Sequence, residues 1–234
     1  MHKLSIVIPT YNEEKTIQAI LKKVERAPLP EGLDKEIIIV DDNSTDQTLA
    51  KIKELGKTYK IFSHTKNQGK GGAVKTGFKY ATGDFLIIQD ADLEYDPNDY
   101  RAMVQPILEG RALVTNGVRI SPQKDARKKK SLYWEAWLGN HLITWTTNLL
   151  YFHNAGEYEG CYKAFTKKLI DSIEVKTNNF DFDNELICKI LKRGIKPIDV
   201  PIHYYPRSYD DGKKINWRHG FIILWTIIKT RFIN

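Results

Sequence analysis

The sequence is poor in cysteine and has no long uninterrupted apolar run. Its two cysteines, Cys161 and Cys188, form no CxxC pair and no Cys/His spacing of the kind that binds zinc. Neither a disulfide framework nor a zinc site is therefore indicated, and a reducing setting is favoured. The most apolar stretch, residues 132–152, is interrupted by Glu135 and by asparagine and histidine, whereas a membrane span needs roughly 20 apolar residues. We expect no transmembrane helix.

Length and charge narrow the fold class and the partners. With 234 residues, 41% of them hydrophobic, the chain is long enough for one α/β domain with an appendage. The 36 Lys and Arg residues exceed the 29 Asp and Glu residues, which gives a formal charge of +7. This charge suits a partner that carries phosphate, such as a nucleotide, an anionic lipid or a nucleic acid. Because no nucleic-acid recognition motif is evident, we expect no nucleic-acid partner.

Strand-like and helix-like segments alternate through residues 1–120. Short apolar runs rich in Ile and Val are each followed by a polar turn and a helical pattern, which is typical of a parallel sheet with crossover helices. A ligand site is then expected at the carboxyl ends of the strands. The expected strands are 4–8, 36–40, 60–64, 85–89 and 113–116, and the expected helices are 13–26 and 45–56.

Residues 121–234 have a different character. We expect an aromatic-rich helix at 132–152, a polar and aromatic segment at 157–165, a helix at 182–191, a strand at 196–203 and a terminal helix at 217–232. The chain therefore divides into 1–120 and 121–234, which we interpret as two halves of one continuous domain.

Short polar residues suggest where the helices begin. Asn12 is expected to cap the first helix, and Asn43 or Ser44 the second, because such side chains accept hydrogen bonds from unpaired backbone N–H groups. Asp96 followed by Pro97 resembles a cap with proline at the first helical position.

Three acidic side chains at alternate positions follow the strand at 85–89. Asp90, Asp92 and Glu94 would repel one another if they converged, unless a hard divalent cation neutralised them. Mg²⁺ and Mn²⁺ bind one or two carboxylates together with phosphate oxygens. The alternative, from these residues alone, is a solvated acidic turn that caps the next helix.

Two further polar segments are ambiguous when taken alone. Asp41 and Asp42 end the strand at 36–40, where a carboxylate can accept hydrogen bonds from a ribose or a base, but the segment is also rich in turn formers. The glycine-rich segment 67–73 lacks the third glycine of GxGxxG and the GK[ST] ending of a P-loop. A helix beginning there could attract an anion, although a tight loop that opens a helix is at least as good an interpretation.

Taken together, these motifs resemble the family 2 glycosyltransferases, and among them the polyprenyl-phosphate (dolichyl-phosphate) mannosyl and glucosyl synthases. The resemblance covers nearly the whole chain. It is carried, in order, by segments 8–13, 40–44, 67–72, 90–94, 161–165, 201–202, 207 and 212–215. It implies the GT-A fold, a Rossmann-like α/β architecture with a mostly parallel sheet flanked by helices, here followed by interfacial helices near the C-terminus. It further implies that 1–120 is a nucleotide-sugar-binding half and that 121–234 is an acceptor-binding half with amphipathic interfacial helices.

The resemblance also implies roles for individual residues. The residues implied to bind the nucleotide-sugar donor are Pro9, Tyr11, Glu13, Val40, Asp42, Asp90 and Ala91. The implied ligands of Mg²⁺ or Mn²⁺ are Asp90, Asp92 and Glu94. The residues implied to act in catalysis, the basic ones by engaging phosphates, are Asp92, Arg119, Arg207 and Lys213.

The activity implied is an inverting, metal-dependent transfer of a hexose, from GDP-mannose or UDP-glucose, to a polyprenyl or dolichyl phosphate. The alternatives are a transferase that acts on a soluble or glycan acceptor and a non-catalytic nucleotide-sugar-binding scaffold. In segment 157–160 the sequence differs from the one that the relatives tend to have. This difference concerns the preference for the sugar or the acceptor. Asp183 and Glu185 would orient the sugar or simply begin an exposed helix.

A chain without a membrane span would need another way to reach a lipid acceptor. The basic run 127–130 precedes the aromatic-rich helix, and the terminal helix has an apolar stripe with Lys229 and Arg231 near its end. Such helices lie in the interface of a membrane or pack against the core or a sister chain. We expect a cytoplasmic protein associated peripherally with the inner face of a membrane.

Overall fold

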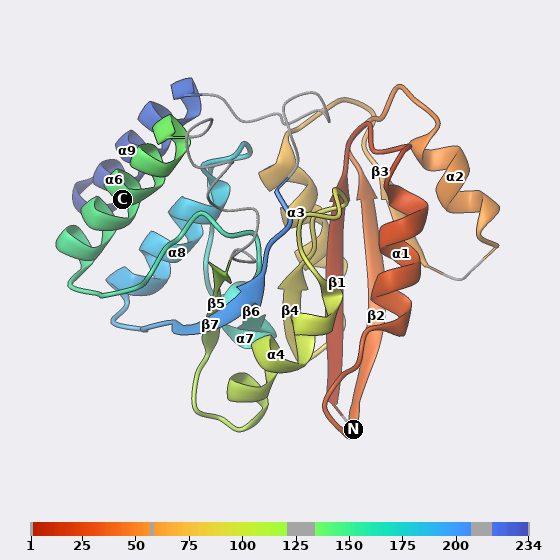
Figure 1. The fold of residues 1–234 in the computed structure, drawn as a ribbon, viewed down its shortest axis with the longest axis horizontal. Helices are drawn as coiled ribbons and strands as arrows, with labels where there is room; N and C mark the ends of the chain where they lie inside the picture. The colour runs from red at the N-terminus through yellow and green to blue at the C-terminus, as the bar shows by residue number, and fades with distance from the viewer. Residues whose placement is uncertain (1, 57–58, 121–133, 207–216, 234) are drawn as a thin grey trace.

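The computed structural model describes residues 2–56, 59–120, 134–206 and 217–233 (Figure 1). Its strands are β1 (His2–Thr10), β2 (Leu33–Asp41), β3 (Lys60–Ser63), β4 (Phe85–Ile88), β5 (Val114–Ile120), β6 (Lys163–Thr166) and β7 (Ile198–His203). Its helices are α1 (Ile17–Arg26), α2 (Thr48–Glu54), α3 (Lys70–Tyr80), the 3-10 helix η1 (Pro97–Asp99), α4 (Tyr100–Leu108), α6 (Trp134–Tyr151), α7 (Lys167–Asp171), α8 (Phe182–Lys192) and α9 (Trp217–Phe232).

The described strands form one seven-stranded sheet in the order β3-β2-β1-β4-β6-β5-β7. The pairs β1 with β2, β1 with β4, β2 with β3 and β5 with β7 are parallel, whereas β6 runs antiparallel to both β4 and β5. The predicted α/β class with a mostly parallel sheet is therefore confirmed. The sheet takes strands from both halves of the chain, since β6 and β7 come from beyond residue 120.

The central strands are apolar along their length because helices cover the sheet on both faces. Residues Leu4 and Ile6 to Ile8 of β1 are fully buried, and so are the four residues of β4. Helix α3 packs against β1 at a position that only glycine fits. A Cβ added to Gly77 would lie 2.2 Å from Cγ1 of Val7, far inside van der Waals contact.

The strand β6 begins within segment 157–165, for which the sequence predicted no strand, and ends one residue beyond it. It has only four residues, and one of them, Lys163, is fully buried. The ammonium of Lys163 donates to the backbone oxygens of Tyr158 (2.9 Å) and Gly160. Because a charged residue occupies a buried position of this strand, the sequence lacks the apolar pattern by which a strand is recognised.

Two of the three predicted helix caps are wrong. Helix α1 begins at Ile17 rather than near residue 13, and α2 begins at Thr48 rather than near 45. Asn12 instead joins the loops after β1 and β2, since its Oδ1 accepts from the backbone N–H of Thr45 at 2.8 Å. The cap at Asp96 is confirmed, because its Oδ1 accepts from the N–H of Asn98 at 3.0 Å and Pro97 begins η1.

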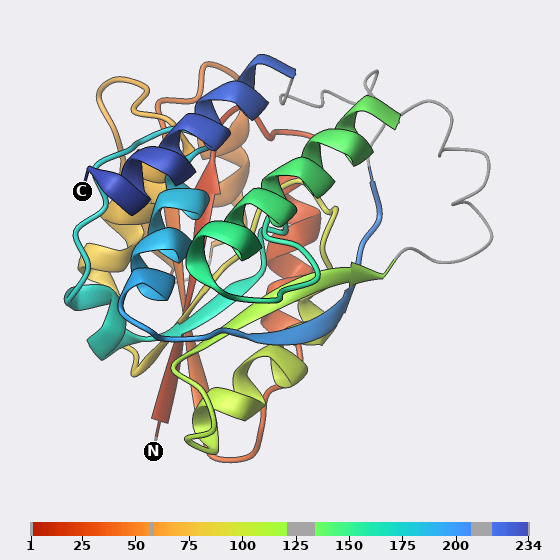
Figure 2. The ribbon, with the colours of Figure 1, turned by 90° about the vertical axis from the view of Figure 1, so that its left-hand side faces the viewer.

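Helices α6 and α9 lie side by side on the outside of the molecule, with α8 between them and the sheet (Figures 1 and 2). Ile143 of α6 and Ile223 and Ile227 of α9 are buried, and the hydroxyl of Tyr151 donates to the backbone oxygen of Ile227 at 2.9 Å. Across the described ranges, no helix combines the length and the apolar character that crossing a membrane requires.

Candidate active site

A cavity of about 650 Å³ opens at the carboxyl ends of β1, β2 and β4. This is the edge of the sheet where the alternating pattern predicts a ligand site. The wall is completed by the loop before β6, by the start of α8 and by inward-facing positions of α6 and α9. The lining residues used below are Pro9, Tyr11, Glu13, Asp42, Asn67, Gly69, Lys70, Asp90, Ala91, Asp92, Glu94, Arg119, Asn140, Ile143, Glu159, Cys161, Asp183, Asn184, Tyr204 and Ile223.

The three predicted metal ligands all line this cavity, but they do not converge. Asp90 pairs with Lys70, whose ammonium lies 2.9 Å from Oδ1 and 3.1 Å from Oδ2. Oδ1 of Asp92 accepts from the backbone N–H of Glu94 at 3.1 Å, and Oε2 of Glu94 accepts from the Tyr204 hydroxyl at 3.0 Å. Within the described ranges, no three acidic, histidine or cysteine side chains are grouped closely enough to hold a metal ion. The assignment of Asp90, Asp92 and Glu94 as metal ligands therefore stays a prediction.

The reason for this arrangement is that Lys70 neutralises the acidic end of the cavity. Its ammonium also lies 3.6 Å from Oδ2 of Asp183, at the start of α8. Burial lowers the pKa of Lys70, but the nearby negative charges, that of Asp90 foremost, outweigh burial and hold its pKa well above the ordinary value. The other oxygen of Asp183, Oδ1, is buried without a hydrogen-bond partner. Asp183 therefore turns one carboxylate oxygen towards Lys70 and keeps the other buried.

Glu159 lies in the same part of the cavity. Its Oε1 accepts from the side-chain amide of Asn184 at 2.8 Å, and burial raises the pKa of its carboxyl group. Cys161, also at the wall, has its pKa raised by burial and is a thiol rather than a thiolate at neutral pH. Segment 157–160, in which the sequence differs from its relatives, therefore contributes the polar, weakly acidic carboxyl group of Glu159 to the site.

Arg119 projects from β5 into the cavity, where two neighbours hold it. Its Nε donates to Oε1 of Glu157 at 2.6 Å, and its guanidinium lies 4.8 Å from the centre of the Tyr204 ring. Because Tyr204 in turn donates to Glu94, a chain of contacts joins the basic residue to the acidic motif. Burial and the charge of Glu94 raise the pKa of Tyr204, so its hydroxyl stays a donor.

Most of the residues predicted to bind the donor line the cavity. Pro9, Tyr11, Glu13 and Ala91 do so together with Asp90. Val40 does not, because its side chain is fully buried in the core beneath β2 and its backbone oxygen accepts from the Thr10 hydroxyl. Val40 is thus the one predicted donor-binding residue that the cavity lining lacks, and its role stays a prediction.

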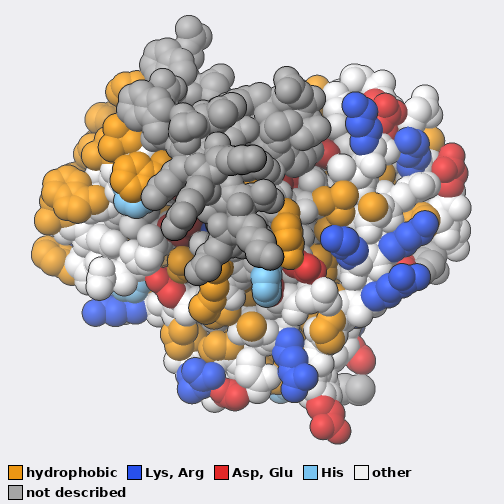
Figure 3. Space-filling model, in the orientation of Figure 1, with side chains coloured by type: hydrophobic (Ala, Val, Ile, Leu, Met, Phe, Trp, Pro, Cys, Tyr) orange, Lys and Arg blue, Asp and Glu red, His pale blue; other side chains and the backbone are white. Residues whose placement is uncertain are grey.

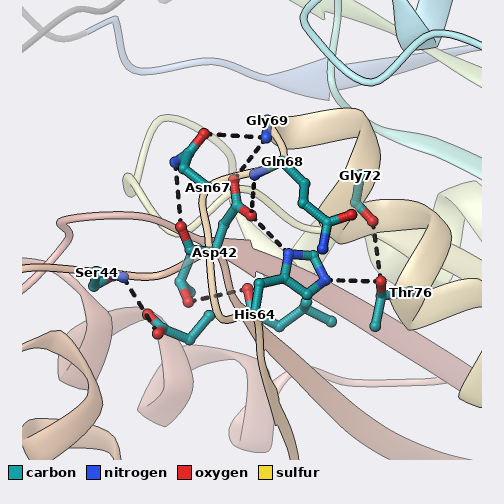
Figure 4. Close-up of polar contacts among 11 residues, drawn as sticks. Asp42, Ser44, His64, Asn67, Gln68, Gly69, Gly72 and Thr76 are labelled. Atoms are coloured by element: carbon teal, nitrogen blue, oxygen red, sulfur yellow. Dashed lines mark hydrogen bonds and ion pairs between the residues drawn. The ribbon is translucent and has the colours of Figure 1, made fainter.

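Asp42 lies at the cavity wall and anchors the glycine-rich segment (Figure 4). Its Oδ1 accepts from the backbone N–H of Gln68 at 2.8 Å, and its Oδ2 accepts from that of Gly69 at 2.8 Å. The side-chain amide of Asn67 donates to the backbone oxygen of Asp42 at 3.2 Å. The helix N-terminus predicted to attract an anion thus already holds one, the carboxylate of Asp42.

The remaining predicted residues divide into two groups. Arg207 and Lys213 lie outside the described residues. Glu185 is buried away from the cavity, where it accepts from the backbone N–H groups of Lys176 and Thr177 and pairs with Lys189 at 2.6 Å. Of the two acidic residues considered for orienting a sugar, only Asp183 lines the cavity.

Sequence reasoning assigned no role to Lys70, Glu159, Tyr204 or His64. Lys70 belongs to the glycine-rich segment, whose motif concerns the glycines and gives no sign that the lysine pairs with Asp90. Tyr204 follows the strand at 196–203, and aromatic residues just past strand ends were a usable signal. Glu159 and His64 carry no local pattern, because Glu159 pairs with Asn184, 25 residues away, and His64 with Asp42 and Thr76, 22 and 12 residues away.

Comparison with known proteins agrees with this geometry. The model of the family described as Glycosyl transferase family 2 matches residues 5–173. A dolichol-phosphate mannosyltransferase from Pyrococcus furiosus is 38% identical over 215 residues, which cover 90% of this chain and 59% of that protein. An undecaprenyl-phosphate 4-deoxy-4-formamido-L-arabinose transferase from an Enterobacter species is 28% identical over 217 residues, covering 91% of this chain and 63% of that protein. The chain thus spans about three fifths of the length of these relatives.

Among solved structures, glucosyl-3-phosphoglycerate synthase from Mycobacterium tuberculosis, in complex with Mn²⁺, UDP and glucosyl-3-phosphoglycerate, superposes with a TM-score of 0.71. The match covers 100% of this chain and 81% of that one at 18% identity. Another structure of that enzyme contains Mg²⁺ and UDP. At this identity the likeness concerns the fold alone, and it confirms the predicted GT-A architecture.

Proposed function

The chain belongs to glycosyltransferase family 2 and is a glycosyltransferase, and on this premise we propose that it transfers a hexose from a nucleotide-sugar to a polyprenyl phosphate. The donor would be GDP-mannose or UDP-glucose, and the acceptor a polyprenyl or dolichyl phosphate. The names of the two relatives, a dolichol-phosphate mannosyltransferase and an undecaprenyl-phosphate 4-deoxy-4-formamido-L-arabinose transferase, support this choice.

One structural observation carries the choice of a lipid acceptor. Helices α6 and α9 face the cavity on one side, through Asn140, Ile143 and Ile223, and present large apolar side chains to solvent on the other. A polar cavity is therefore bordered by an apolar outer surface. An acceptor with a phosphate head and a hydrocarbon tail fits both, because its head can enter the cavity while its tail follows the helices.

The residues present fit a divalent cation, provided that the donor completes the coordination. Carboxylate oxygens are the ligands that Mg²⁺ and Mn²⁺ prefer, and these ions take only one or two of them when phosphates supply the rest. We propose that Asp92, with Asp90 or Glu94, holds the ion against the diphosphate of the donor. When bound, the ion would act as a Lewis acid on the departing nucleoside diphosphate.

The protein's own task is then positioning and charge neutralisation rather than proton transfer. A phosphate oxygen is already ionised at neutral pH, so a lipid phosphate acceptor needs no general base. Arg119 would face the phosphate charges, held in place by Glu157 and the Tyr204 ring. Arg207 and Lys213, by their resemblance to family positions, would add positive charge. In-line attack would invert the anomeric centre.

A transfer assay tests this proposal. Purified protein is incubated with labelled GDP-mannose or UDP-glucose, each with and without polyprenyl phosphate, and with Mn²⁺ or with a chelator. We expect label to enter the lipid fraction with one donor only, and chelation to abolish the transfer. Transfer only to a water-soluble acceptor would refute the lipid acceptor, and binding of donor without any transfer would favour the non-catalytic scaffold.

The exposed faces of α6 and α9 support association with a membrane surface. Apolar side chains gather over these helices, on the left of Figure 3. On α6 and just after it, Trp137, Leu138, Leu142, Trp145, Leu149 and Phe152 are exposed. On α9 and just after it, Phe221, Ile222, Trp225, Ile228, Phe232 and Ile233 are exposed. The sequence of α9 contains no acidic residue and ends with Lys229 and Arg231, which suits an anionic lipid surface.

Vesicle binding tests this part of the proposal. In Trp145→Ser with Trp225→Ser, two rings that are 63% and 59% exposed lose their apolar surface. At about 1 kcal/mol for each half-buried ring, binding to anionic vesicles should weaken roughly thirtyfold. Leu149→Ser and Leu113→Ser form a matched pair, because both leucines are about half exposed but only Leu149 lies on α6. Equal vesicle binding by the wild type and the double tryptophan variant would contradict a membrane role for this face.

A further inference from the structure

A buried hydrogen-bond network lies behind the cavity wall and centres on His64 (Figure 4). Its Nδ1 lies 2.7 Å from Oδ1 of Asp42, and its Nε2 lies 2.9 Å from the hydroxyl of Thr76, on α3. The side chains of His64 and Asp42 are only 7% and 4% exposed. Asp42 lines the cavity, whereas His64 and Thr76 do not. The imidazole thus connects the end of β2 with α3 without reaching the ligand space.

The hydrogen bonds of Asp42 leave little of its carboxylate unused. Oδ1 accepts from both His64 and the N–H of Gln68, while Oδ2 accepts from the N–H of Gly69. Each carboxylate oxygen has two acceptor positions, so only Oδ2 retains one. Since a carboxylate only accepts, Nδ1 of His64 must carry the proton in this contact. Oδ2 can therefore accept a hydrogen bond from a ligand in the cavity. The contact with His64 occupies Oδ1 and so determines that Oδ2 is the oxygen left for the ligand.

The segment held by Asp42 spans two walls of the cavity. Asn67, Gly69 and Lys70 line the cavity, and the N–H of Gly72, two residues further, donates to the backbone oxygen of Asn178 at 3.1 Å, next to the lining residue Asn179. There is no room for adjustment, since a Cβ on Gly69 would lie 2.5 Å from that same oxygen. A displacement of Asp42 would therefore move the loop that positions Lys70.

We propose that His64 is a positioning residue for the nucleotide. Through Asp42 it holds the segment 67–70 in place and presents one carboxylate oxygen to an N–H or O–H group of the nucleoside, without touching the ligand itself. This role rests on the proposed function, because it requires that the cavity bind a nucleotide-sugar. It assigns nucleotide affinity in part to a side chain that lies outside the cavity.

Two substitutions at His64 separate the two ends of the imidazole. The amide nitrogen of asparagine reaches the position of Nδ1, so His64→Asn can still donate to Asp42. The longer glutamine reaches the position of Nε2, so His64→Gln keeps the contact with Thr76 and loses that with Asp42. Thr76→Val is nearly isosteric and removes the hydroxyl while it leaves the contact between His64 and Asp42 in place.

Calorimetric titration with UDP and with GDP, each with MnCl₂, tests the proposal. For the nucleotide that the wild type binds, we expect affinity to fall roughly tenfold in His64→Gln, the factor that corresponds to one charge-assisted hydrogen bond of about 1.4 kcal/mol. His64→Asn should stay within about threefold of the wild type. In transfer assays the KM for the donor should rise in His64→Gln, while kcat at saturating donor changes little.

Melting temperatures measured in parallel separate positioning from folding. A purely structural role would lower the Tm of His64→Gln and leave its nucleotide affinity at the wild-type value, and that result would overturn the proposal. Equal loss of affinity in the asparagine and glutamine variants would overturn it too. If His64→Gln does not fold, His64→Asn and Thr76→Val decide, because both keep a donor to Asp42: affinities within about threefold of the wild type support the proposal, and a roughly tenfold loss in either overturns it. A wild type that binds neither nucleotide would instead refute the proposed function.

Discussion

Replacing Lys70 with methionine should make the stability of the protein depend on a divalent cation. Lys70 is the cation that the described structure places against Asp90, at 2.9 Å, and near Asp183, at 3.6 Å. At an effective dielectric constant of about 20, unit charges at these separations attract by roughly 6 and 5 kcal/mol before desolvation is subtracted. Methionine keeps the apolar stem but leaves the two carboxylates without a counter-charge.

The net effect is smaller than the sum of these attractions. The three side chains are 14% to 21% exposed, so water screens them in part and desolvation offsets much of the attraction. We expect the metal-free variant to lose about 2 kcal/mol, which for a chain of this length lowers Tm by roughly 4–8 °C. A divalent cation supplies the missing charge. Addition of Mn²⁺ should therefore raise the Tm of the variant by several degrees more than that of the wild type, in which Lys70 competes for Asp90.

Differential scanning calorimetry with and without MnCl₂ measures both quantities. Lys75→Met is the matched control, because Lys75 lies on the same helix and contacts only the backbone oxygen of Val175 among the hydrogen bonds of the described residues. If Mn²⁺ raises the Tm of Lys70→Met no more than that of the control and the wild type, Lys70 and the cation do not share Asp90, and the reasoning is wrong.

Two further predictions concern carboxylates with different roles. Asp92→Asn preserves the oxygen that accepts from the N–H of Glu94 but removes the charge, so transfer should fall by at least about a hundredfold with little change in Tm; unchanged metal-dependent transfer would refute the assignment of Asp92. Glu185 has a pKa lowered to about 2, because its hydrogen bonds with Lys189 and with backbone N–H groups outweigh the opposing effect of burial. A lowered pKa stabilises the fold above the ordinary value of 4.5, and this contribution is lost as the pH falls from about 4.5 towards 2. Urea midpoints of the wild type and Glu185→Gln should therefore differ most at pH 7 and clearly less at pH 3, and a constant difference would contradict the lowered pKa.

The parts of the fold that were predictable are those that burial alone determines. The strand predicted at 85–89 was found because all four residues of β4 are buried on both faces, which leaves a continuous apolar run. Helix starts were predicted poorly, because the capping side chain made its hydrogen bonds elsewhere. Asn12 bonds to Thr45, 33 residues away, and a contact between two loops has no signature near either residue.

The site shows the same division between local and distant causes. That Asp90, Asp92 and Glu94 would reach one cavity followed from their place at a strand end. Their mutual arrangement did not follow, because it depends on Lys70 of α3 and on Tyr204 after β7, which only the tertiary fold brings to them. Isolated motifs therefore predicted which residues line the cavity. They did not predict the hydrogen-bond and ion-pair partners of those residues.

The glycine-rich segment illustrates why a failed motif match can still be informative. It lacks the pattern of a phosphate-binding loop, and the structure gives its glycines another purpose. A Cβ on Gly71 would lie 2.5 Å from Cβ of Phe182, so glycine is required for α3 to approach α8. The N–H groups of Gln68 and Gly69 are taken by Asp42, and Lys70, one residue further, turns its charge to Asp90. The start of α3 therefore holds two carboxylates of the cavity wall, those of Asp42 and Asp90, and its glycines serve close packing rather than a phosphate-binding loop.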